Sequence, residues 1–126
     1  MNKTLMVLLV AALLALVTPS TFALDVGKLE KALNQYAAAS EWMNMVMHPG
    51  MPKPWTNPQL PDKIKQLHEA QDTIRKEVAS IQTKEEMAQA RAIADTYKMA
   101  GGIYRDVGYQ LEYMLNEREK FLTTQQ

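Results

Sequence analysis

Cysteine is absent from all 126 residues of the chain. Its absence excludes a disulfide framework, lipoprotein processing and a cysteine nucleophile. The fold must therefore rest on an apolar core and on helix packing. About a hundred residues beyond the N-terminal leader described below are enough for one such domain of modest stability.

An excess of charge of one sign is also lacking. The chain has 14 basic and 14 acidic residues, which alternate without forming a basic block. We therefore expect neither nucleic acid nor an anionic membrane surface as a partner. Phosphate-binding glycine loops, a nucleophile elbow and the Glu-x-x-His pairs of di-iron bundles are missing too. The sequence thus predicts a protein without catalytic activity.

The first 23 residues predict a secretory signal peptide. Lys3 supplies its positive charge, Leu5–Val17 is an apolar run of thirteen residues, and Ala23 ends a cleavage site. Thirteen helical residues span about 20 Å, less than the roughly 30 Å of a bilayer core. We expect cleavage after Ala23, no stable membrane insertion of the mature chain, and a location in the bacterial periplasm or outside the cell. The mature domain, residues 24–126, would keep 13 basic and 14 acidic residues after the loss of Lys3.

The remaining sequence predicts an all-α fold, an antiparallel bundle of three to four helices over residues 25–48, 61–82 and 84–122. Mostly apolar residues in these segments recur largely at alternating steps of three and four, the heptad pattern of helices that pack as in a coiled coil. This pattern is carried by Val26, Leu29, Leu33, Tyr36, Ser40, Met43 and Met47; by Leu60, Ile64, Leu67, Gln71, Ile74, Val78 and Ile81; and by Met87, Ile93, Tyr97, Ala100, Tyr104, Val107, Leu111, Met114 and Phe121. Such faces also make an oligomer a reasonable expectation.

The third segment contains Gly101-Gly102. Two glycines cost a helix roughly 2 kcal/mol, which favours a break. The heptad pattern nevertheless keeps its phase across the pair, and no capping residue precedes Ile103. Small residues recur at Ala94, Gly101 and Gly108, where they would let another helix approach closely. We expect that neighbour to be the first helix, at Ala37–Ala39, and predict one continuous, bent helix in preference to two helices.

The stretch from residue 42 to residue 61 is the most unusual part of the chain, because it holds both tryptophans and five of the six prolines. Its prolines predict a stiff, extended loop over residues 49–61. Trp42 and Met45 fall outside the heptad pattern, on the outward face of the first helix. Two explanations remain open: Met51 or Trp55 folds back to cover them in a small satellite core, or the patch docks a partner.

Met45, His48 and Met51 form the pattern Met-x-x-His-x-x-Met. Thioether and imidazole groups suit Cu(I) or Ag(I) better than magnesium or calcium. The pattern resembles the Met/His motifs of periplasmic copper- and silver-binding proteins, and this resemblance implies a metal site at these three residues. It spans seven residues and occurs once in the chain.

Tyr109 and Tyr113 lie four residues apart and outside the heptad pattern, so that two interpretations are open: ordinary partial burial, or extension of a contact surface. Together these observations predict a small exported protein that binds an envelope or secreted protein. The expected partner-binding residues are Trp42, Met45, Trp55, Tyr109 and Tyr113. The alternative is a periplasmic Cu(I)- or Ag(I)-binding protein that uses Met45, His48 and Met51.

Overall fold

The computed structural model describes residues 23–125, which form an all-helical fold and confirm the predicted bundle. The elements are α2 (Val26–Val46), the 3-10 turn η1 (Pro54–Thr56), α3 (Leu60–Ala79), α4 (Lys84–Ala100) and α5 (Gly102–Thr124). The expected leader, apart from Ala23, lies outside the described residues.

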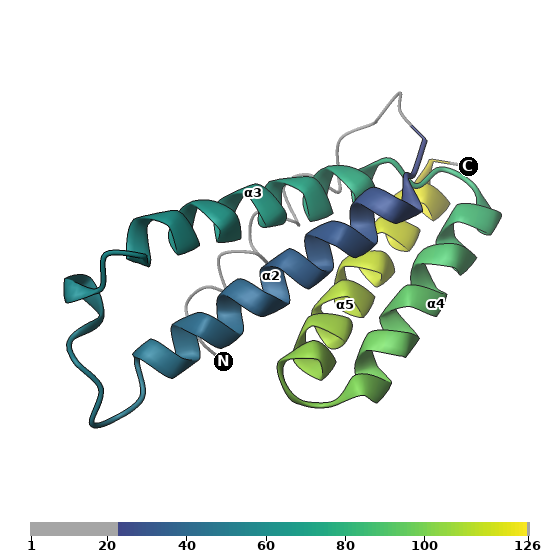
Figure 1. Ribbon diagram of the computed structural model, residues 1–126. Helices are drawn as coiled ribbons and strands as arrows, with labels where there is room; N and C mark the ends of the chain where they lie inside the picture. Colours follow the sequence, from purple (N-terminus) through teal and green to yellow (C-terminus); the bar gives the residue numbers. More distant parts are fainter. Residues whose placement is uncertain (1–22, 126) are drawn as a thin grey trace.

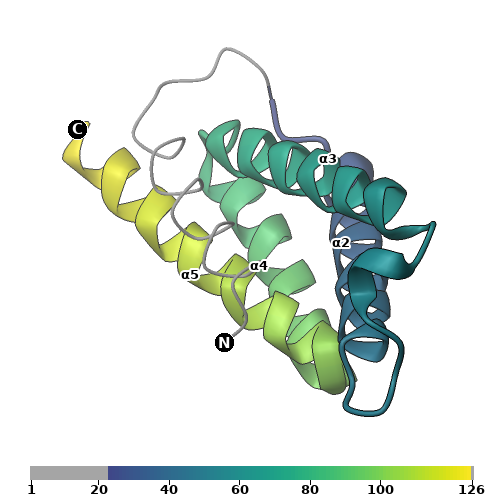
Figure 2. The ribbon, with the colours of Figure 1, turned by 90° about the vertical axis from the view of Figure 1, so that its left-hand side faces the viewer.

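The helices pair into two antiparallel hairpins, α2 with α3 and α4 with α5 (Figure 1). The view from the loop end shows one hairpin lying against the other (Figure 2). The α2–α3 hairpin extends beyond the turn that joins α4 to α5 (Figure 1). Its loop and the adjoining helix ends therefore stand clear of the second hairpin.

All four helices contribute to one core, and the predicted heptad faces are buried along most of their length. The buried core residues on these faces include Leu29, Leu33, Tyr36, Leu67, Ile74, Val78, Val107, Leu111 and Met114. The prediction is wrong at the helix ends, where Met47, Ile64 and Ala100 are exposed. Met47 and Ile64 lie where the α2–α3 hairpin protrudes, so no second hairpin faces them. Ala100 is the last residue of α4, beside the turn.

The expectation of one continuous helix over residues 84–122 is wrong, because the chain turns back at Gly101. This glycine has φ 82° and ψ 172°, and Gly102 has φ 58°. Positive φ is easy for glycine and incompatible with a continuing right-handed helix. The apolar pattern keeps its phase because the apolar faces of α4 and α5 both pack against the same core.

The small residues do permit a close helix contact, but the predicted neighbour is wrong. A Cβ atom on Gly108 would lie 2.6 Å from the backbone nitrogen of Lys98 and 2.9 Å from the carbonyl oxygen of Ala94. Gly108 therefore packs directly on the backbone of α4. The contact with Ala37–Ala39 of α2 was expected for an unbroken helix; the turn at Gly101 instead brings Ala94 and Gly108 together.

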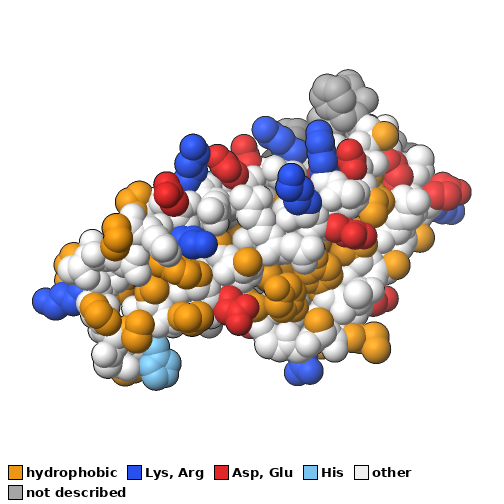
Figure 3. Space-filling view, viewed as in Figure 1, with side chains coloured by type: hydrophobic (Ala, Val, Ile, Leu, Met, Phe, Trp, Pro, Cys, Tyr) orange, Lys and Arg blue, Asp and Glu red, His pale blue; other side chains and the backbone are white. Residues whose placement is uncertain are grey.

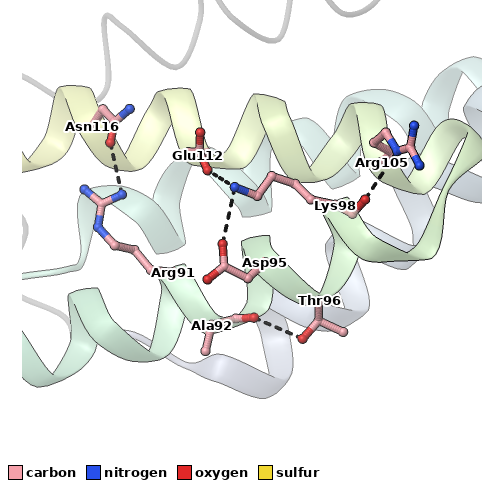
Figure 4. Close-up of polar contacts among 8 residues, drawn as sticks. All are labelled: Arg91, Ala92, Asp95, Thr96, Lys98, Arg105, Glu112 and Asn116. Carbon is pink, nitrogen blue, oxygen red and sulfur yellow. Dashed lines mark hydrogen bonds and ion pairs between the residues drawn. The ribbon is translucent and has the colours of Figure 1, made fainter.

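Polar side chains also join α4 to α5 (Figure 4). Arg91 donates to the Asn116 side chain at 3.0 Å and pairs with Glu119. Lys98 pairs with Glu112 and, at 3.3 Å, with Asp95 of its own helix. The hydrogen bond to Glu112 raises the pKa of Lys98. This hairpin is thus held by both close backbone packing and ion pairs.

Arg118 and Tyr36 are among the side chains with polar groups that lie deep in the bundle. Arg118 is buried, its Nε donates to the carbonyl oxygen of Ile81 at 2.9 Å, and burial lowers its pKa. It links α5 to the turn between α3 and α4. Tyr36 is also buried, beside Ser40 and Gln71. Burial raises the pKa of the Tyr36 hydroxyl to about 12, although its two polar neighbours act in the opposite direction.

Candidate functional site

We call residues 42–64 the hairpin tip, since they form the protruding end of the α2–α3 hairpin. Helix α2 stops there because a residue before proline avoids the helical region, and Pro49 follows His48. Gly50 then adopts φ 93°, which completes the reversal. Local hydrogen bonds shape the rest of the loop: the Asn57 amide donates to the Pro54 carbonyl at 3.0 Å, and the Asn57 side chain accepts from Gln59 at 2.9 Å.

Large apolar side chains of the hairpin tip face solvent. Their exposed fractions are 61% for Met45, 63% for Met47, 51% for Met51, 71% for Trp55 and 39% for Ile64. Hydrophobic side chains gather at this end of the molecule, with basic and histidine side chains among them (Figure 3). The satellite-core interpretation is therefore wrong, because the loop runs outward and leaves Met45, Met51 and Trp55 uncovered.

Each tryptophan of the tip lies beside a lysine. The Nζ atom of Lys63 is 5.7 Å from the centroid of the Trp42 ring, and Trp42 is partly buried. Lys53 Nζ is 5.4 Å from the centroid of the Trp55 ring, which remains open to solvent. A lysine over an indole face is a favourable cation–π arrangement. The tip therefore presents an apolar surface with a lysine beside each of its tryptophans.

Met45, His48 and Met51 lie on two successive turns of backbone. The His48 amide donates to the Met45 carbonyl at 3.3 Å, and the Met51 amide donates to the His48 carbonyl at 3.1 Å. His48 Nδ1 lies 3.0 Å from the carbonyl oxygen of Pro49. A histidine that donates through Nδ1 keeps Nε2 for a ligand, the usual arrangement around a bound metal. Thioether and imidazole donors are of the type that suits a soft monovalent ion.

Other metal-binding side chains do not cluster in the described part of the chain. Between residues 23 and 125, no group of three or more His, Asp or Glu side chains is placed to hold a metal ion.

Tyr109 and Tyr113 belong to a different surface from the other predicted partner-binding residues. They are 55% and 42% exposed on α5, and Lys98 Nζ lies 5.4 Å from the Tyr109 ring centroid. Figure 1 shows α5 in a different part of the molecule from the loop that joins α2 to α3. Trp42, Met45 and Trp55 thus share the hairpin tip, and the two tyrosines do not extend it.

Met47 and Ile64 are the tip residues that sequence reasoning missed, because their heptad positions placed them in the core. Both lie within a turn or so of a helix end next to the loop. Their position next to a long connection was the signal that could have indicated exposure. An apolar helix face is buried only where a neighbouring helix packs against it.

The chain matches no family model, and searches of curated proteins and of solved structures find no protein similar to it. None of the described helices is long and apolar enough to cross a membrane. The hairpin tip is therefore interpreted from its own chemistry.

Proposed function

We propose that this protein is a small exported binding protein whose hairpin tip docks onto another envelope or secreted protein, without catalysis. The observation that carries the proposal is the exposure of Met45, Met47, Met51 and Trp55 at one protruding end. Contiguous exposed apolar side chains with polar residues at their margin are typical of contact surfaces. The exposed side chains of these four residues add nothing to the buried core, so their exposure is better explained by a contact surface.

The side chains of the tip also indicate the kind of partner. Methionine is flexible and adapts to irregular apolar surfaces, whereas tryptophan is a rigid anchor that often dominates binding energy. Lys53 and Lys63 lie over the tryptophan rings and place positive charge around the apolar centre. A partner surface with an apolar groove and carboxylates at its rim would complement this tip.

Site-specific photocrosslinking in cells that export the full chain tests this function. A crosslinking residue in place of Met51 or Trp55 should capture a discrete partner protein. The same residue in place of Met99 is the matched control, because Met99 is 86% exposed but lies beside the α4–α5 turn. Trp42→Ala/Trp55→Ala should abolish the capture at position 51. Equal capture from positions 51 and 99 would contradict the proposal.

A second candidate function is the binding of Cu(I) or Ag(I) by Met45, His48 and Met51. The two successive turns that bring these exposed residues onto one short segment favour it. Titration with Cu(I) under reducing conditions should quench tryptophan fluorescence, since Trp42 and Trp55 flank the segment. His48→Ala should weaken the binding at least tenfold, whereas His68→Ala, an exposed histidine on α3, should not. Equal affinities of the two variants would eliminate the metal site.

A further inference from the structure

The start of the described chain is anchored to the helical domain. The backbone nitrogen of Leu24 donates to Glu86 Oε2 at 2.7 Å, and the Leu24 side chain packs against the core. The next backbone nitrogen, that of Asp25, donates to Glu77 Oε1, also at 2.7 Å. Two carboxylates from α3 and α4 therefore receive the first two amides after Ala23.

Glu86 is held in place by its own helix. It belongs to the capping box of α4: its Oε1 accepts from the Thr83 amide at 3.2 Å, and its amide donates to Thr83 Oγ1 at 3.1 Å. Partial burial raises the pKa of Glu86, but hydrogen bonds from Gln82, Leu24 and Thr83 outweigh this effect and lower it overall. A preorganised, ionised carboxylate thus faces the Leu24 nitrogen.

We propose that cleavage after Ala23 turns this hydrogen bond into an ion pair between the new α-ammonium group of Leu24 and Glu86. Processing would then fasten the start of α2 to the turn between α3 and α4. The inference rests on the predicted cleavage site and on the geometry at Leu24. It is independent of what the hairpin tip binds.

The chemistry of the step is simple hydrolysis. A leader-cleaving protease adds one water to the Ala23–Leu24 peptide bond, which leaves a carboxylate on Ala23 and an amine on Leu24. An ordinary α-amine has a pKa of about 7.7 to 8.0, so most of it takes up a proton at neutral pH. The Leu24 nitrogen then has a full positive charge and three donor hydrogens, where the uncleaved amide has one. Charge-assisted hydrogen bonds are roughly twice as strong as neutral ones.

The surrounding charges favour the ammonium form. Glu86, Glu77 and Asp25 lie at or next to the Leu24 nitrogen. Lys28, Lys31 and Lys76 line, together with Glu77, an open hollow between α2 and α3. The ion pair would raise the α-amine pKa above its ordinary value. While Glu86 is ionised, the stabilising effect of the pair is therefore complete below the ordinary α-amine pKa of about 8 and is lost as the pH rises through the raised pKa.

The test uses protein exported from the full chain. N-terminal sequencing should find Leu24 as the first residue. The α-amine pKa, followed by NMR or by the pH dependence of its acylation rate, should lie at least about half a unit above the ordinary range near 8. Glu86→Gln should return it to that range, and the unfolding temperature at pH 7 should fall by roughly 4 °C.

Two features make the comparison specific. Glutamine retains the capping-box hydrogen bonds, so Glu86→Gln removes the charge without removing the cap. Glu85→Gln removes the same charge from the same turn of α4, where Glu85 is exposed, and should leave the α-amine pKa unchanged.

A first residue other than Leu24, or an uncleaved exported chain, would overturn the inference. So would the same α-amine pKa in the parent and Glu86→Gln proteins. These readouts do not involve residues 42–64, so failure here leaves the proposed tip function standing, and loss of partner capture leaves the ion pair standing.

Discussion

The two hairpins are built from the same heptad pattern but differ in how their helices are joined. Helices α4 and α5 meet across Gly101 alone, with Gly108 against the α4 backbone and ion pairs between the helices. Helices α2 and α3 are joined by thirteen residues, 47–59, and their joined end protrudes with its apolar side chains exposed. The length of the connection thus distinguishes a hairpin that closes the bundle from one that presents a surface.

This difference separates stability from recognition. Residues of the α4–α5 contact have little room to change without loss of packing. Exposed residues of the hairpin tip contribute little to folding and are free to serve a contact. The predictions below test this separation.

The largest effect is expected at the closest contact of the α4–α5 hairpin. Gly108→Ala should lower the free energy of unfolding by about 3 kcal/mol, because the new Cβ would meet backbone atoms of α4. The matched control is Gly27→Ala, where the nearest atom to a new Cβ is 3.5 Å away, and it should be neutral or slightly stabilising. Chemical denaturation of both variants gives the comparison. A Gly108→Ala protein as stable as the parent would refute the close contact.

Removal of the buried guanidinium of Arg118 should have the next largest effect. Arg118→Met leaves the Ile81 carbonyl without this donor, which should cost about 2 kcal/mol. Lys120→Met, two residues further along α5, removes an exposed charge that pairs with Glu117 of the same helix, and should cost less than about 0.5 kcal/mol. Urea midpoints of the two variants should therefore differ clearly; coincident midpoints would argue against a structural role for Arg118.

The two connections themselves offer a direct comparison, since each contains a glycine with positive φ. Gly101→Ala should cost about 1.5 kcal/mol, because φ 82° with ψ 172° is nearly inaccessible to alanine and the short turn cannot rearrange. Gly50→Ala, at φ 93°, should cost less, roughly 0.5 kcal/mol, since the long loop is able to relax. The ratio of the two losses, measured by thermal unfolding, reports the stiffness of each connection. Equal losses would mean that the long loop is as constrained as the turn.

The free energy of unfolding should depend on pH through Tyr36, which lies in the buried part of the α2–α3 hairpin. An unfolded tyrosine ionises near pH 10, whereas the pKa of folded Tyr36 is about 12. The unfolded chain thus releases this proton first, so stability is unaffected below about pH 10 and declines as the pH rises towards 12. Tyr36→Phe should make the decline shallower. An unchanged slope of stability against pH between these values would show that Tyr36 is not the responsible group.

The smallest effects on folding are expected at the hairpin tip. Met51→Ala and Trp55→Ala should each change the free energy of unfolding by less than about 0.5 kcal/mol, because both side chains are already exposed. Differential scanning calorimetry at neutral pH would measure the change. A loss near 2 kcal/mol from either variant would mean that the loop packs on the bundle, and the distinction between the two hairpins would fail.

Local signals in the sequence predicted much of this fold. Asp25 caps α2, and Thr83 with Glu86 forms a capping box at the start of α4; both caps depend on neighbouring residues alone. Outcomes that depend on distant parts of the chain were missed. Met43 packs against the core while Met47, one turn later on the same face, is exposed, since only the first lies beside a facing helix. At Gly101-Gly102 the local signal was correct, because two glycines favour a break. The apolar pattern in phase across the pair pointed the other way, since α4 and α5 pack against the same core.

The orientation of the bundle has a practical consequence. The start of α2 and the end of α5 lie at the end of the bundle away from the Pro-rich loop (Figure 1). Helix α2 has 21 residues and therefore a length of about 30 Å. The α2–α3 hairpin thus extends away from the C-terminal end of the bundle. A protein immobilised through its C-terminus would therefore present residues 42–64 to the surrounding solution. Attachment at that end, in an assay or in a fusion, should leave recognition intact.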